Sequence, residues 1–264
     1  MPLYSSDALI LRTYKLGEAD RIVVFLTSDR GKKRGVAKGA RRLRSKFVGG
    51  LEPLTQVRVA YFEKERRELV SVNYSEPSCS PLAAVDPEAL GYSAYFAELL
   101  DEWAQEADPD ERLYRLGAGM VEALAAGVAV EPLARYFEYW LLRLQGVYPP
   151  HLNCYQCGDM LGATGDESAV LSSGGRGFTC TRCLPHGGGL RLSSDALSLL
   201  SRVRRINPLQ IGELEVTPVV LHEIESVHRA LIAAHLEKEL KSIRVLKNMR
   251  NTFLKARGAH PRLS

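Results

Sequence analysis

Hydrophobic residues in the first third of the chain follow the spacing of short β-strands. Apolar runs at 8–12, 21–27 and 35–39 are separated by polar turns that contain glycine. Val57, Val59 and Tyr61 alternate with more polar positions, which is the period of a half-buried strand, and residues 69–74 repeat the pattern. Five short strands predict a small closed barrel, because closure removes exposed strand edges.

From residue 86 onward the apolar spacing becomes that of α-helices. Tyr92, Phe96, Leu99 and Trp103 recur at helical intervals. Further helices are predicted from 108–109, from near Pro132, over 193–205, and from 218 to about 255. We therefore predict a barrel domain over residues 1–83 and a helical domain over 84–264, the latter interrupted by an insertion at about 150–190.

Composition supports a folded chain with segregated charge. The chain has 264 residues, 45% of them hydrophobic, which suits about two domains with packed cores. Its net charge of +4 conceals a balance of +7 over residues 1–83, −9 over 84–139 and +6 over 140–264. Basic ends around an acidic middle indicate a surface that binds a polyanion and a separate part that does not.

The densest charge lies in residues 30–46, which hold nine Lys and Arg and no acidic residue. Val36 and Leu43 are the only large apolar residues among positions 31–46. A solvated loop explains four or five such charges, whereas nine favour a polyanion partner because they repel one another. We expect nucleic-acid phosphates to bind here, with bases resting on Tyr14, Phe25, Phe47, Tyr61 or Phe62 where these are not core residues. The candidate DNA-binding residues are Arg30, Lys32, Lys33, Arg34, Lys38, Arg41, Arg42, Arg44 and Lys46.

A second basic row lies near the C-terminus. Lys238, Lys241 and Arg244 are spaced by three on the helix predicted from 218 to about 255. Steps of three fall short of a full helical turn, so the row winds around the helix. A solvated helix with a few phosphate contacts fits best, and we treat these residues as a secondary DNA-binding candidate.

Four of the five cysteines form two CxxC pairs. Cys154 and Cys157 are followed, after 22 residues, by Cys180 and Cys183. Each pair can aim two thiolates at one ion, and two pairs supply the closed tetrahedral set typical of structural Zn²⁺. We expect one structural zinc per chain, the alternative being four reduced cysteines without a ligand. A closed set leaves no position for catalysis.

The sequence contains no catalytic motif that we recognise. It lacks GxxxxGK[ST], GxGxxG and GxSxG, and His222-Glu223 lacks the second histidine of HExxH. We therefore expect a protein that is not an enzyme. No apolar run approaches the ~20 residues of a membrane span, and the start lacks a secretion pattern, so we expect a cytoplasmic protein associated with the nucleoid.

Several segments resemble the bacterial RecO recombination-mediator family. They are "ALILRTYKLGEADRIVVFLTSDRGK", "AKGARRLRSK", "LEPLTQVRVAYF", "YSAYFAELLDEW", "FEYWLLRLQGVYP" and "LKSIRVL", which together cover nearly the whole chain. The most specific pair is "LGEADR" followed by "AKGAR". Residues at family motif positions are Gly17, Glu18, Asp20, Gly31, Ala37, Lys38, Gly39, Ala40, Arg41 and Ser45.

The resemblance implies a mixed β and α protein: an N-terminal five-stranded oligonucleotide/oligosaccharide-binding (OB) fold, then an all-α domain with an inserted four-cysteine zinc ribbon. It implies a mediator of DNA repair and homologous recombination that binds single- and double-stranded DNA and anneals complementary strands. Its implied partners are RecR and single-strand-binding protein, and through them it promotes loading of the recombinase RecA.

Two alternatives from other classes stay open at this stage. One is an RNA-binding module built of a barrel and a ribbon, which would prefer RNA to DNA of equal sequence. The other is an accessory subunit of a nucleic-acid-processing enzyme, which would accompany nucleotide- or metal-dependent turnover.

Overall fold

The computed structural model describes residues 2–64, 68–83, 87–148, 152–162, 168–172, 177–184, 189–246 and 248–249. The chain forms two compact units, residues 1–127 together with 240–264, and residues 128–239. The division at residue 84 that the sequence predicts follows the change from strands to helices, and it stays a prediction. Among the described residues no helix is long and apolar enough to cross a membrane.

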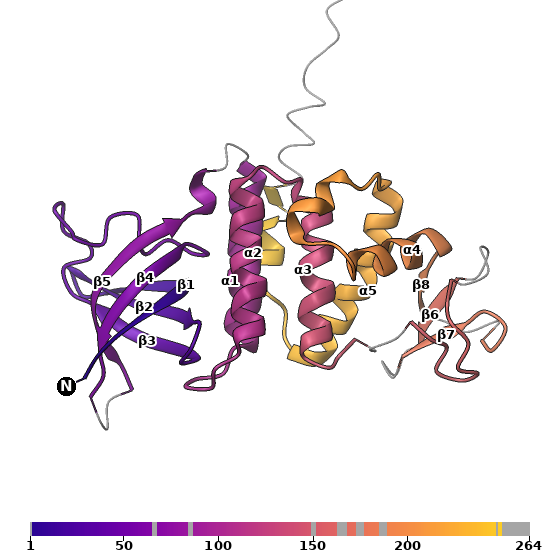
Figure 1. Ribbon diagram of the computed structural model, residues 1–264, viewed down its shortest axis with the longest axis horizontal. Coiled ribbons are helices and arrows are strands. Elements are labelled where there is room, and N and C mark those ends of the chain that lie inside the picture. The colour runs from indigo at the N-terminus through magenta and orange to yellow at the C-terminus, as the bar shows by residue number, and fades with distance from the viewer. Residues whose placement is uncertain are drawn as a thin grey trace, which may run out of the picture. The chain divides into compact units, whose positions relative to one another are not determined.

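The N-terminal strands form a closed five-stranded barrel, as predicted (Figure 1). Its strands are β1 (Leu3–Leu16), β2 (Asp20–Thr27), β3 (Lys32–Ala37), β4 (Gln56–Phe62) and β5 (Val70–Cys79). They lie in the order β1-β2-β3-β5-β4, and β4 closes the barrel against β1. Every pairing is antiparallel except that of β3 with β5.

The parallel pairing of β3 with β5 requires a glycine. Gly35 lies opposite Val70, and a Cβ at Gly35 would come within 2.8 Å of methyl groups of both Val70 and Val72. The barrel interior is filled mainly by residues of alternate strand positions, which is why the two-residue period predicted the strands. Two core residues come instead from the connection between β3 and β4: Phe47 and Leu51.

Two helices accompany the barrel in the first unit, α1 (Pro87–Trp103) and α2 (Glu111–Ala125), preceded by a 3₁₀ turn, η1 (Pro81–Ala83). Asp101 of α1 joins them to two strands: its carboxylate lies 2.5 Å from Arg12 Nη2 of β1 and 3.3 Å from Lys32 Nζ of β3. Asp110 accepts a hydrogen bond from the Leu113 N–H and caps α2, where the sequence predicts a helix start.

The helix predicted from 218 to about 255 is interrupted, so this prediction is wrong. α5 spans Pro218–Leu236, and Glu237 adopts a left-handed conformation with φ of 53°. A new helical segment covers residues 241–246. Its first N–H groups, of Lys241 and Ser242, donate to the carboxylate of Glu98 on α1, as does the Ser242 hydroxyl.

Glu98 therefore caps the start of this last helical segment. Burial alone would raise the pKa of Glu98, but the hydrogen bonds from Ser242 and Lys241 outweigh it and lower the pKa. The residues of the break, Glu237 to Leu240, are good helix formers, so their composition gives no hint of an end. The cap of the segment after the break comes from a partner 143 residues away in sequence, which local composition does not indicate.

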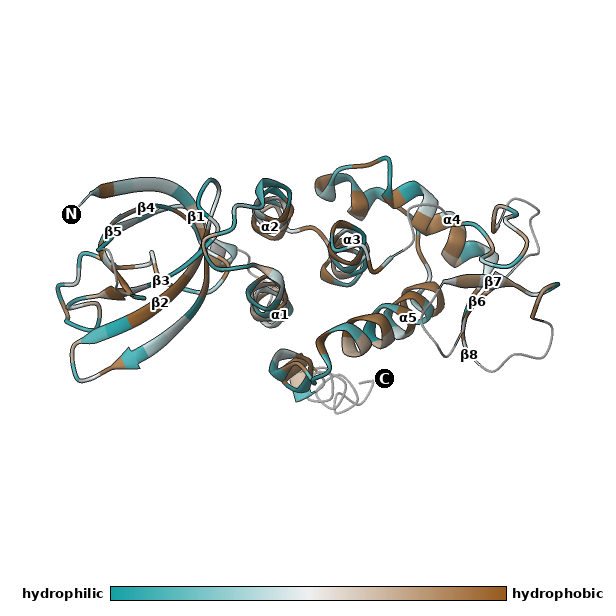
Figure 2. Cartoon of the chain, turned by 90° about the horizontal axis from the view of Figure 1, so that it is seen from below, coloured by the Kyte–Doolittle hydropathy of each residue, from teal (hydrophilic) through white to brown (hydrophobic). Residues whose placement is uncertain are grey.

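The second unit combines three helices with a small sheet. The helices are α3 (Val130–Leu144), α4 (Ser194–Val203) and α5, and a 3₁₀ segment, η2 (Pro208–Glu213), follows α4. Strands β6 (Ala169–Ser172), β7 (Phe178–Cys180) and β8 (Gly189–Leu192) pair in the order β7-β6-β8, within the predicted insertion. α4 mixes hydrophobic and hydrophilic residues around the helix, as expected for a helix with one buried side (Figure 2). In α3 every residue from Leu133 to Tyr139 is buried, so this helix is enclosed on all sides over those two turns.

A buried charged group lies between α3 and α5. Glu138, fully buried, has one carboxylate oxygen 3.0 Å from Arg135 Nη2 and the other 3.1 Å from His228 Nδ1. His228 Nε2 has no hydrogen-bond partner among the described residues. The neutral tautomer that carries its proton on Nδ1 satisfies Glu138 and leaves Nε2 without a proton, which avoids an unpaired buried N–H.

We expect this histidine to make the stability of the protein depend on pH. Burial lowers the pKa of His228 below its ordinary value of about 6.5, against the opposing effect of Glu138. Below pH about 6.5 the unfolded chain then binds the proton more readily than the folded one. The stabilising effect is complete above that pH and is lost as pH falls toward the lowered pKa.

Urea unfolding at pH 7.5 and 5.5 checks this expectation. The wild type should have a lower midpoint at pH 5.5, and His228→Gln, which does not titrate, should show a clearly smaller difference between the two values. His222→Gln is the matched control, because His222 is exposed on the same helix. An equal pH difference in wild type and His228→Gln would contradict the assignment.

Candidate nucleic-acid interface and metal centre

The basic loop, which we define as residues 38–50, is attached to the turn between β1 and β2. The Asp20 carboxylate accepts a hydrogen bond of 2.7 Å from the Gly39 N–H. Arg41 donates its backbone N–H to the Ala19 carbonyl at 2.9 Å and its Nη1 to the Gly17 carbonyl at 2.8 Å. Gly39 has a φ of 71°, a conformation that favours glycine. Four residues that stand at family motif positions, Gly17, Asp20, Gly39 and Arg41, thus hold the loop.

Three of the nine candidate cations have acidic partners. Lys33 Nζ lies 2.8 Å from Glu63 Oε1, and Lys32 pairs with Asp101 as described above. Arg30 lies 3.6 Å from the neighbouring carboxylate of Asp29, and its guanidinium lies over the Tyr4 ring, 4.0 Å from the centroid. These pairs reduce the charge that Arg30, Lys32 and Lys33 offer to a ligand.

The other six cations have no acidic partner in the part of the chain that the structure describes. All are exposed: Arg34, Lys38, Arg41, Arg42, Arg44 and Lys46. Arg41 bonds to the Gly17 carbonyl, and Lys46 lies 3.4 Å from the amide oxygen of Asn73, both neutral acceptors. Five of the six lie in the basic loop, so the unpaired charge is concentrated there.

The aromatic candidates for base stacking also fall into two groups, those buried in the barrel core and those exposed to solvent. Phe25, Phe47 and Tyr61 belong to the barrel core and are 0, 3 and 0% exposed, so they cannot receive bases. Tyr14 is 42% exposed, and the structure adds Tyr74, 37% exposed, which the sequence analysis did not name. Alternation from the core residues Val70 and Val72 would place Tyr74 inside the barrel, but the register of β5 shifts between Val72 and Tyr74 and turns this ring outward.

The secondary basic candidates do not share one helix. Lys238 follows the end of α5, whereas Lys241 and Arg244 lie on the next helical segment. Lys238 belongs to the second unit, and Lys241 and Arg244 belong to the first. All three side chains are exposed. The winding row predicted from their spacing is therefore replaced by two separate groups.

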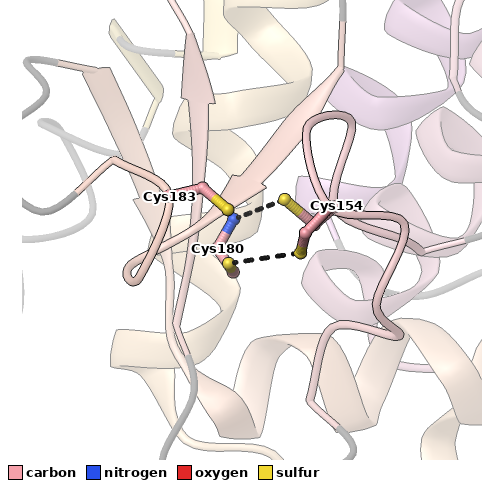
Figure 3. A group of neighbouring side chains, drawn as sticks. Cys154, Cys180 and Cys183 are labelled. Atoms are coloured by element: carbon pink, nitrogen blue, oxygen red, sulfur yellow. Dashed lines mark hydrogen bonds between the residues drawn. The ribbon is translucent and has the colours of Figure 1, made fainter.

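The four cysteines of the CxxC pairs come together, as their spacing predicts. Their Sγ atoms all lie within 4.8 Å of one another. Cys154 and Cys157 come from a turn closed by the Gly158 N–H and the Cys154 carbonyl, and Cys180 and Cys183 from a turn at the end of β7. In Figure 3 the sulfurs of the two turns face each other across a small gap.

The spacing of these sulfurs fits a tetrahedral metal ion. With metal–sulfur bonds of about 2.3 Å, the edge of a tetrahedron is about 3.8 Å. Cys157 Sγ and Cys180 Sγ, which come from different turns, are 3.9 Å apart. The four cysteines therefore can hold a metal ion with no protein movement beyond small adjustments of their side chains.

Without a cation the thiols of Cys154 and Cys183 have very different pKa values. Burial would raise the pKa of Cys154, but backbone N–H groups of Cys157, Cys180 and Gln156 outweigh it and lower that pKa to about 6. The hydrogen bond with the Cys180 thiol raises the pKa of Cys183 to about 12. Neighbouring thiolates repel, and a divalent cation bound among them offsets that repulsion.

Two family models match the chain over most of its length. "Recombination protein O N terminal" matches residues 1–80, and "Recombination protein O C terminal" matches residues 84–244. The boundary between the two matches lies near the predicted domain boundary.

Curated relatives point to the same family as the two family models. A protein of Koribacter versatilis named DNA repair protein RecO is 37% identical over 202 residues, 76% of this chain and 78% of its own length. Proteins of the same name from Roseiflexus and Nocardioides are each 31% identical, and the matches cover 94% and 91% of this chain and 86% and 98% of the relatives. The chain thus belongs to the RecO family, the recombination protein O family of DNA repair proteins.

Proposed function

We propose that this protein mediates DNA repair by homologous recombination: it binds single- and double-stranded DNA and anneals complementary strands. The observation that carries the proposal is the basic loop: five exposed cations that have no acidic partner among the described residues, on a loop attached to a closed barrel. Membership in a family of proteins named for DNA repair supports it.

The arrangement suits annealing because it binds phosphates without fixing bases. Lys and Arg bind DNA mainly by releasing condensed counterions, which requires no sequence. Two complementary strands repel each other, and a shared basic surface reduces that repulsion while each strand can still slide. The acidic residues of the α1–α2 region, among them Glu102, Asp108 and Glu111, repel DNA and restrict it to the basic surface.

We further propose that the protein acts with RecR on DNA covered by single-strand-binding protein and so promotes RecA loading. This part rests on family membership alone. The protein does so without nucleotide hydrolysis or strand cleavage, since we assign no side chain of the described residues a catalytic role. The proposed setting is the cytoplasm, at the nucleoid.

The metal centre is proposed to hold one structural Zn²⁺. Four cysteine sulfurs in a closed set match the preference of zinc for soft ligands in a tetrahedron. Strands β6, β7 and β8 contain only three or four residues each, so the sheet has a small core of its own. A bound ion stabilises such a sheet by joining the ends of its turns.

The first prediction concerns the basic loop. Reversing two charges with Arg42→Glu and Arg44→Glu should flatten the slope of log affinity against log salt for a single strand by roughly 1.4, from about 0.7 per phosphate contact. Affinity should fall about equally for all sequences, because phosphate contacts carry no base information. Arg112→Glu with Arg115→Glu, two exposed arginines of α2, is the matched control and should keep the wild-type slope.

Fluorescence anisotropy of a labelled oligonucleotide across a salt series measures this slope, with circular dichroism to confirm folding. An unchanged slope in the well-folded Arg42/Arg44 variant would show that the loop does not bind the phosphates. Tighter binding to RNA than to DNA of the same sequence would favour the RNA-binding alternative.

The second prediction concerns the reaction. Complementary strands precoated with single-strand-binding protein should anneal faster with this protein than without it, in the absence of ATP, and RecR should change the rate. Quenching between dyes on the two strands measures annealing, and a gel measures strand length. ATP hydrolysis or strand shortening in proportion to the protein would contradict the proposal.

The third prediction concerns the metal. Protein purified without chelator should contain one zinc per chain by elemental analysis. Cys154→Ser should lose the zinc and melt at a lower temperature, while DNA affinity per folded molecule changes less. Cys79→Ser is the control, because Cys79 lies on β5 of the barrel and outside the cluster. Wild-type protein without zinc would refute the assignment.

A further inference from the structure

Leu43 is an exposed apolar residue surrounded in sequence by cations. Its exposed fraction is 103%, the highest of any large hydrophobic residue that the structure describes. It lies between Arg42 and Arg44, both exposed and both without an acidic partner among the described residues. The fold buries none of this side chain, so its apolar surface is available to a ligand that also pairs with the two arginines.

The loop presents Leu43 in a defined way. The Ser45 N–H donates to the Arg42 carbonyl at 3.1 Å, so Leu43 is the first central residue of a tight turn. The preceding turn is closed by the Arg42 N–H and the Gly39 carbonyl, also at 3.1 Å. The loop is anchored on its other side by Phe47, 3% exposed in the barrel core. Phe47 therefore anchors the loop in the core, whereas Leu43 lies exposed in a turn that a hydrogen bond closes.

We propose that Leu43 is a wedge that inserts between stacked base pairs of duplex DNA while Arg42 and Arg44 bind phosphates beside it. The inference rests on the proposed DNA binding and adds a way in which the protein distorts its ligand. The ligand that fits the turn has closely spaced anionic groups with apolar surface behind them. Duplex DNA has this chemistry, since phosphates line the grooves and base faces lie within, and apolar side chains such as Leu are known to enter base steps.

A duplex fits Leu43 better than a single strand does. Bases of single strands are bound mainly by stacking on aromatic rings or on arginine, and leucine has no π-face. A wedge acts only where bases are stacked, because it replaces stacking with its own contacts. Insertion should therefore be easiest at flexible pyrimidine–purine steps and at mismatches, which unstack at the lowest cost. In annealing, such a wedge would favour the opening of wrongly paired encounters.

A fluorescent base reports the wedge directly. Short duplexes with 2-aminopurine beside a central TA step, or beside a GC step, would be saturated with the full-length protein, because unstacking raises 2-aminopurine fluorescence. Four proteins are compared: wild type, Leu43→Gln, Leu43→Met and Val48→Thr. Gln keeps the length of the side chain and removes its apolar character, whereas Met keeps both. Val48, 75% exposed in the same loop, is the matched control outside the arginine group.

Binding of wild type, Leu43→Met or Val48→Thr should raise the 2-aminopurine fluorescence beside the TA step. This rise should be larger than the rise beside the GC step. Leu43→Gln should lose at least two thirds of the rise. Affinity for a single strand should agree within about twofold among all four, since phosphate contacts dominate it. Thermal melting should be unchanged, because Leu43 is not buried.

Each contrary outcome overturns a distinct statement. Duplex binding with no fluorescence rise, or with an equal rise in Leu43→Gln, would overturn the wedge and leave DNA binding intact. Wild type that binds neither duplex nor single strand would overturn the proposed function and the wedge with it. Unchanged DNA behaviour of Leu43→Gln together with weaker binding to RecR would overturn the wedge and assign Leu43 to a protein interface.

Discussion

The attachment of the basic loop to the β1–β2 turn is the constraint on which the proposed interface depends. Five like charges within residues 38–50 repel one another, and an unattached loop would relieve the repulsion by extending into solvent. The Asp20 carboxylate opposes this by accepting the Gly39 N–H, and the Gly17 and Ala19 carbonyls accept from Arg41. Phe47 adds an apolar anchor in the barrel core. The cations therefore stay close together with their side chains in water, the arrangement that attracts a polyanion most strongly.

Features set by local spacing could be predicted from the sequence. Short apolar runs between polar turns predict β1, β2 and β3, and alternation of apolar residues predicts β4 and β5, because one face of each strand lies against the core. The two CxxC pairs predict the sulfur cluster, because each turn brings its own two thiols together and only the meeting of the turns is non-local. Two helix starts were predicted closely. α2 was predicted from 108–109 and begins at Glu111 after the cap Asp110, and α5 begins at Pro218 as predicted.

Features set by partners distant in the sequence could not be predicted. The helical segment that follows α5 is capped by Glu98, which lies on another helix, and nothing in the composition of residues 237–240 indicates a break. Within the part of the chain that the structure describes, three of the nine candidate cations have acidic partners. Two of these pairs could not be predicted, because only the fold brings Asp101 to Lys32 and Glu63 to Lys33. Burial of Phe25 and Tyr61 likewise follows from the side of the strand on which each lies. Charge density thus predicts where the proposed interface lies, but not which of its cations have acidic partners.

Paired and unpaired charges have different effects in this fold. Lys32 and Arg12 both form ion pairs with the carboxylate of Asp101. These two cations therefore attach α1 to the barrel, and they offer less charge to a ligand. Glu138 in the second unit is enclosed with Arg135 and His228, and this buried group acts on stability and its pH dependence. Among the described residues, Arg41 and Lys46 of the basic loop bond to neutral oxygens, which leaves their charge for the phosphates of the proposed ligand. A neutral acceptor such as the Gly17 carbonyl can hold Arg41 in place without cancelling its charge, and this permits one arginine both to fasten the loop and to attract DNA.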